Sequence, residues 1–162
     1  MYLYPISENV SSSAIDGTAR EIREQHQRAA LYKALASSNL CGRVVNRSLL
    51  PRVHALFPGW EVRYFISDYN KRWREFCFSR RRDDQTGERY DLYIANNDSP
   101  RLDPEYLLSK AEESTERAHR LESALADFQD ALGQYNNLVG YLSALRDRLR
   151  PVMYQSGYPN SW

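Results

Sequence analysis

A heptad repeat of apolar residues runs from Leu107 to Leu149 and limits the folds available to this chain. Steps of four and three residues, taken alternately from Leu107, reach thirteen positions, and eleven of these are apolar or aromatic. A stripe that recurs every 3.5 residues stays against a neighbouring helix when the two helices supercoil. The repeat therefore predicts one long helix that pairs as in a coiled coil.

The predicted bounds of this helix, about 101–150, follow from residues that favour helix ends. Asp103 has a side chain that can cap free backbone N–H groups, and Pro104 suits the first helical position because its missing N–H costs nothing there. Pro151 is expected to stop the helix, since proline removes a hydrogen bond and clashes with the preceding turn. Residues 151–162 are then predicted to be an irregular tail.

Gly133 and Gly140 lie inside this helix, although each glycine costs about 1 kcal/mol relative to alanine. A hairpin at this point is the alternative. We expect a continuous helix, because an inserted loop would shift the heptad repeat out of phase and the repeat stays in phase.

The apolar stripe of the helix widens toward its C-terminal end. The flanking positions change from charged to apolar along the chain, in the order Arg117, Ala124, Ala131, Leu138 and Leu145. We expect the wide part, past about Ala124, to pack on the N-terminal helix and the sheet, while residues 104–120 project and bind a second copy of the chain. The predicted oligomer interface consists of Leu107, Ala111, Ala118, Leu121, Leu125 and Phe128.

Residues 1–100 are predicted to form an α+β body. A 3.6-residue apolar pattern predicts a helix over about 14–38, in which Thr18 and Glu21 have the spacing of an N-terminal capping box. A second, short helix is expected over about 48–57. These two helices supply apolar faces for a sheet.

After residue 59 the apolar period changes from 3.6 to 2, which predicts strands over about 60–67, 72–81 and 88–95. Short connections between them favour an antiparallel meander. One face is expected to receive the helices and carries Val62, Tyr64, Ile66, Phe76, Phe78, Tyr90, Leu92 and Ile94. The reverse face is mixed in character and carries Arg63, Phe65, Trp73, Glu75, Cys77, Arg89, Asp91 and Tyr93.

Basic residues interleaved with aromatic ones on the second predicted strand form a candidate surface for nucleic acid or another partner. Such a ribbon can follow a phosphate backbone while its rings stack on bases. The alternative is an ordinary solvated strand, because edge strands carry charges that prevent edge-to-edge pairing. The candidate residues are Lys71, Arg72, Trp73, Arg74, Arg80, Arg81 and Arg82.

The composition gives little support for other classes of site. A net charge of +1 provides no general attraction to nucleic acid or to a membrane. We find neither a signal peptide nor an apolar run of transmembrane length, so we expect a cytoplasmic protein with no membrane partner. Cys41 and Cys77 are expected to be buried, reduced thiols, because neither has the spacing of a metal site.

Known catalytic and cofactor motifs are missing from the sequence, including nucleophile elbows, phosphate-binding glycine loops and zinc-protease helices. His26 lies on the apolar stripe of the first helix, where we expect it to pack, partly buried, or to reach a carboxylate. We therefore expect no enzyme, no cofactor and no metal, although catalysis by residues distant in sequence is an open alternative.

The sequence thus predicts a non-enzymatic, oligomeric binding or scaffold protein that presents a surface to another macromolecule. Its expected partners are a second copy of itself, most simply as a dimer, and another protein. The alternative is a nucleic-acid-binding protein that uses the basic aromatic ribbon over 69–82.

Overall fold

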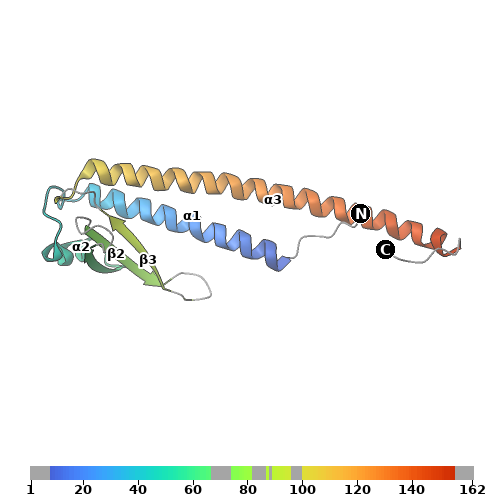
Figure 1. Ribbon diagram of the computed structural model, residues 1–162, viewed down its shortest axis with the longest axis horizontal. Coiled ribbons are helices and arrows are strands. Elements are labelled where there is room, and N and C mark those ends of the chain that lie inside the picture. The colour runs from blue at the N-terminus through green and yellow to red at the C-terminus, as the bar shows by residue number, and fades with distance from the viewer. Residues whose placement is uncertain (1–7, 67–73, 82–86, 88, 96–99, 156–162) are drawn as a thin grey trace. The chain divides into compact units, whose positions relative to one another are not determined.

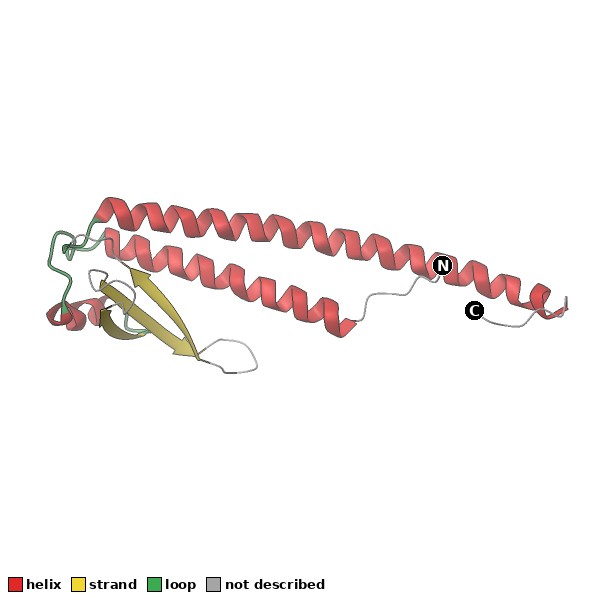
Figure 2. Cartoon of the chain, viewed as in Figure 1, coloured by secondary structure: helices red, strands yellow, loops and turns green. Residues whose placement is uncertain are grey.

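The computed structural model describes residues 8–66, 74–81, 87, 89–95 and 100–155. In chain order these form α1 (Glu8–Ala36), a short 3-10 helix η1 (Arg47–Leu49), α2 (Leu50–Leu56), β1 (Glu61–Ile66), β2 (Arg74–Arg81), β3 (Arg89–Ala95) and α3 (Pro104–Gln155) (Figures 1 and 2). The predicted α+β class, with a three-stranded sheet and a long C-terminal helix, is confirmed.

The chain divides into two compact units. The body comprises Glu21–His119, and the helical unit comprises Met1–Arg20 together with Arg120–Trp162. Helices α1 and α3 each contribute residues to both units, whereas the sheet and α2 belong to the body alone.

The sheet of the body is an antiparallel meander in the order β1-β2-β3, as the sequence predicts. The register aligns Val62, Phe78 and Leu92 in one row across all three strands. A second row contains Tyr64, Phe76 and Ile94. Because alternate residues of a strand share a face, both rows lie on the predicted inner face. Ile66 was also predicted there, but it lies at the end of β1 and is half exposed.

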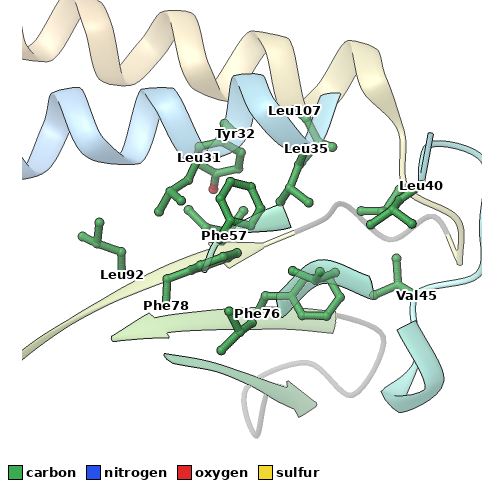
Figure 3. Close-up of a cluster of buried hydrophobic side chains, with 14 of the residues drawn as sticks. Leu31, Tyr32, Leu35, Leu40, Val45, Phe57, Phe76, Phe78, Leu92 and Leu107 are labelled. Carbon is green, nitrogen blue, oxygen red and sulfur yellow. The ribbon is translucent and has the colours of Figure 1, made fainter. Parts of the chain in front are cut away.

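The core of the body fills the space between the inner face of the sheet and the helices (Figure 3). Phe57, at the end of α2, meets Phe78 edge to face, with ring centroids 5.1 Å apart. Helices α1 and α3 add aliphatic side chains to the same cluster. Burial of such apolar area is the main favourable term in folding. The helices and their connections contribute Leu31, Tyr32, Leu35, Leu40, Val53, Leu102 and Leu107, among others.

The connection that leaves α1 is hydrogen-bonded to the connection that enters α3. The N–H of Gly42 donates to the carbonyl of Leu102 (2.9 Å), and the N–H of Leu102 donates to the carbonyl of Arg43 (2.9 Å). Val44 and Arg101 form an antiparallel bridge at this point. Gly42 has φ +83°, which glycine adopts readily and other residues do not. This short ladder fixes the chain where the two long helices meet the core.

Helix α1 begins six residues earlier than predicted, at Glu8, and ends at Ala36. Thr18 is therefore inside the helix, and the predicted capping box at Thr18 and Glu21 is wrong. The Thr18 hydroxyl donates instead to the carbonyl of Ala14 (2.8 Å), the backbonding that threonine commonly makes in a helix interior.

Helix α3 is continuous from Pro104 to Gln155, so the prediction that it passes through Gly133 and Gly140 without a break is confirmed. Its 52 residues span about 78 Å at the usual rise of ~1.5 Å per residue. The prediction that Pro151 ends the helix is wrong, since residues 151–155 are helical. A proline costs one hydrogen bond and kinks a helix, but it does not by itself terminate one. The rest of the predicted tail, 156–162, lies outside the described residues.

The prediction that the first half of α3 projects from the body is wrong. Leu107, Ala111 and Ala118, which were expected to project, are buried, whereas Ala124, Phe128 and Leu138 are exposed. Residues 104–119 of this first half belong to the body, and they begin directly after the ladder between Gly42 and Leu102. Apolar character alone does not distinguish the halves, since both carry the repeat.

Two neighbouring leucines of α3 test this packing. Leu107 is 1% exposed and Leu108 is 47% exposed. We expect Leu107→Ala to lower the free energy of unfolding by about 3 kcal/mol, because it removes buried methyl groups and leaves a cavity. Leu108→Ala makes the same chemical change on the surface and should alter it by less than about 0.5 kcal/mol. Urea denaturation followed by circular dichroism measures both, and equal effects would contradict the core described here.

Candidate functional site

The C-terminal half of α3 carries a second apolar stripe, most of whose side chains are exposed. Its eight members follow the four-and-three spacing of a coiled-coil contact, and every one is apolar or aromatic. We call this stripe the exposed seam. It consists of Ala124, Phe128, Ala131, Tyr135, Leu138, Leu142, Leu145 and Leu149.

Most side chains of the exposed seam are open to solvent. Leu138 and Leu149 are both 51% exposed, and Phe128 and Leu142 are both 39% exposed. Tyr141, beside the seam, is 64% exposed. The described part of the chain thus leaves a continuous apolar strip on one helix, and soluble monomers rarely expose large apolar patches of this kind.

The adjoining stripe on the same helix is covered to a greater extent. Val139 is buried, and Leu121, Leu125 and Leu132 are half-buried. Leu125, Leu132 and Val139 each lie one position beyond a member of the exposed seam, so they occupy the neighbouring strip of the helix surface. This half of α3 therefore has two apolar faces, of which one is largely covered within the chain and the other is exposed.

The structure separates the residues of the interface predicted from sequence. Leu107, Ala111 and Ala118 are buried within the chain, so a second copy does not reach them without disrupting the core. Leu121 and Leu125 are half-buried. Of the six predicted residues, Phe128 alone belongs to the exposed seam. The widening of the stripe past Ala124 marked Ala131, Leu138 and Leu145 in the sequence, although we interpreted it as a face that packs on the N-terminal helix and the sheet.

The candidate basic ribbon is described only in part, because Lys71, Arg72, Trp73 and Arg82 lie outside the described residues. Within β2, the Arg80 guanidinium lies over the ring of Trp60, 4.3 Å from its centroid, and Arg80 Nε donates to Tyr90 Oη (3.0 Å). Arg74 is half-buried and Arg81 is exposed. Arg80 is therefore engaged within the body, and Arg81 is the more accessible cation of this strand.

The outer face of the sheet has the mixed character predicted for it. Arg63 Nη2 of β1 lies 3.5 Å from Ser79 Oγ and 3.8 Å from Asp91 Oδ2, so it reaches across the central strand. Ser79 also donates to Asp91. Polar side chains from the edge strands thereby cover the middle of β2, where Cys77 and Ser79 are buried. These charges bind one another instead of forming an open binding surface.

An arginine-lined cleft lies where the connections around α1 and α3 meet α2. We call it the arginine cleft; its volume is about 460 Å³, and its lining consists of Arg43, Val44, Asn46, Ser48, Leu49, Arg52 and Arg101. Among the residues that the structure describes, this lining contains no carboxylate. Arg101 Nη1 donates to the carbonyl of Gly42 (2.8 Å), which holds one guanidinium at the edge of the cleft. The cleft escaped the sequence analysis because its three arginines come from separate segments.

A second cleft, of about 370 Å³, lies between α1, β3 and α3 within the body. Its cationic side chains have partners in the chain. Arg28 Nη1 donates to the carbonyl of Tyr93 (3.0 Å), Lys110 pairs with Glu113 (3.1 Å), and Arg117 pairs with Glu21 (3.5 Å). Exposed pairs of this kind contribute little stability, but they neutralise the charge of the cleft.

The residues with catalytic or metal-binding potential do not form a site within the described residues. Burial raises the pKa of the Cys41 thiol, and the nearby Asp103 carboxylate raises it further, so this thiol is not activated. Cys77 is buried. His26 is exposed, not partly buried as predicted, and its ring meets that of His119 edge to face at 6.0 Å. No group of three metal-binding side chains occurs among the residues that the structure describes.

None of the described helices has both the length and the apolar character needed to cross a lipid bilayer. Comparison of the chain with protein-family models, curated proteins and solved structures finds no match.

Proposed function

We propose that this protein is a non-enzymatic scaffold that associates with a second copy of itself through the exposed seam of α3. The observation that carries the proposal is the run of eight apolar positions, of which Phe128, Leu138, Leu142 and Leu149 remain between 39% and 51% exposed in the single chain. A helix with such a stripe gains stability when a facing helix removes the stripe from water.

A second copy is the occupant that the helix lengths favour. Helix α1 has 29 residues and α3 has 52, so at least 23 residues of α3 have no counterpart in α1, wherever the two lie. The seam of another copy has the same length and the same spacing. A two-fold symmetric pair uses one surface patch on both subunits, which is the commonest form of homo-oligomer.

The body gives such an assembly something to present. It has its own hydrophobic core, and all residues that line the arginine cleft belong to it. A dimer through the seam carries two bodies and therefore two copies of each surface. Two linked copies bind a partner that offers repeated sites more tightly than one copy does.

Acidic substitutions in the seam test the self-association. We expect the wild-type protein to have at least twice the 18.9 kDa mass of one chain in light scattering. Leu138→Asp combined with Leu142→Asp should return the mass to that of one chain, because each change places a carboxylate in a contact that excludes water.

Leu108→Asp is the matched control, since Leu108 lies on the same helix and is exposed to a similar extent, 47%. It should leave the mass of the assembly unchanged. A wild-type chain that stays monomeric at high concentration would contradict the proposal, as would equal dissociation by the Leu108 variant.

Nucleic-acid binding is a second candidate function, and the arginine cleft is the observation that favours it. Guanidinium groups bind phosphate oxygens with paired hydrogen bonds, and the exposed Arg43 and Arg52 both line this cleft. Arg81 of β2 is a further exposed cation on the body. The ligand class that we propose is single-stranded DNA or RNA, because the phosphates of a single strand are accessible from one side of that strand.

Charge reversal in the cleft tests this second function. We expect Arg43→Glu with Arg52→Glu to weaken the binding of a single-stranded oligonucleotide and to reduce the slope of log K against log salt concentration, because fewer counterions are released. Fluorescence anisotropy at several salt concentrations measures both quantities. Arg23→Glu on α1, also exposed, is the control. Two results would contradict a role for the cleft. One is an affinity that does not depend on salt concentration, and the other is a control variant that weakens binding as much as the cleft variant does.

A further inference from the structure

We infer that the two copies pair through the exposed seam in antiparallel orientation, about a two-fold axis that passes between Asn136 and Asn137. The inference rests on the proposed self-association and adds the direction and register of the pair. It follows from the sizes of the seam residues and from the charges beside them. In this one arrangement, both the sizes and the charges of one copy complement those of the other.

The seam residues fall into two heptad positions with different size patterns. One position holds Ala124, Ala131, Leu138 and Leu145, and the other holds Phe128, Tyr135, Leu142 and Leu149. A parallel pair places each residue against its own copy, whereas an antiparallel pair places the two positions against each other. The first position contains both small members of the seam, so the two orientations pack differently.

In the antiparallel register each alanine of the seam faces a leucine. Ala124 lies opposite the partner's Leu149, and Ala131 lies opposite the partner's Leu142. Nearer the axis, Tyr135 lies opposite the partner's Leu138, while Phe128 lies opposite the partner's Leu145. All eight positions are used, and every layer contains at least one large side chain. The volume of the contact is therefore distributed evenly along the seam.

A parallel pair distributes the same side chains unevenly. Ala124 and Ala131 would each meet another alanine, while Phe128 and Tyr135 would each meet a second ring. Alternating layers of small and large volume leave voids beside crowded contacts, and both reduce stability because protein contacts pack as closely as organic crystals. Moving the antiparallel pair by one heptad also loses contacts, since at least two of the eight layers then have no partner in the seam.

Two exposed charges support the same register. Asp127 and Arg148 each precede a seam residue, Phe128 and Leu149 respectively, so both lie on the same flank of the seam. The two-fold axis places Asp127 beside the partner's Arg148, and symmetry repeats the pair at the other end. In a parallel pair, a residue on this flank, such as Asp127, lies beside the partner residue whose number is higher by five. That residue is the partner's Leu132 for Asp127, so no charge pair forms.

Charge exchange between these positions tests the orientation. Asp127→Arg places two arginines together at both ends of an antiparallel dimer, and Arg148→Asp does the same with two aspartates. We expect each single variant to weaken the dimer about tenfold at low salt, because it turns two exposed attractive pairs into repulsive ones. The double variant makes both pairs attractive again, so it should recover most of this loss. Sedimentation equilibrium measures the dimer dissociation constants. Asp130→Arg, on the outer side of the same helix, should have no such effect.

A mixing experiment completes the test. The two single variants, one labelled with a donor and the other with an acceptor fluorophore at the amino terminus, should form mixed dimers in preference to either homodimer, since both ends of the mixed dimer are complementary. A wild-type monomer would overturn both the self-association and the orientation. A wild-type dimer that Leu138→Asp with Leu142→Asp dissociates, but in which the charge variants show no mutual preference, would overturn the antiparallel register alone.

Discussion

The constraint on which this structure depends is that an apolar helix face must be removed from water along its whole length. Helix α3 spans about 78 Å at ~1.5 Å per residue, whereas the 29 residues of α1 span about 44 Å. The first half of α3 meets this requirement inside the body, through Leu107 and Ala111. In the second half, Phe128, Leu138, Leu142 and Leu149 stay partly exposed in the described chain, and a second copy with the same seam is the partner that we propose for them.

The body has a hydrophobic core of its own. Its sheet is closed on the inner face by Phe57 and the long helices, while polar side chains cross the outer face over β2. The ladder between Gly42 and Leu102 ties the exits of both helices to that core. The two functions that we propose, self-association and ligand binding, therefore use residues from different parts of the chain.

The sequence predicted those features that depend on local period and failed on those that depend on tertiary contact. The heptad repeat predicted an unbroken α3, and the change to a period of 2 predicted the three strands and their inner face. The repeat did not show which half of α3 is buried, because Leu107 and Leu142 are the same residue at the same heptad position, yet Leu107 is buried and Leu142 is exposed. The arginine cleft also required the structure, since Arg43, Arg52 and Arg101 become neighbours through the ladder and α2.

Amide hydrogen exchange along α3, measured at low and high protein concentration, tests most directly the claim that the two halves of the helix have different partners. Amides in residues 128–149 should exchange more slowly at high concentration, because pairing of the seam opposes local opening there. Amides in residues 107–118, which the body protects, should exchange at the same rate at both concentrations. A C-terminal half whose protection does not change with concentration would contradict the account.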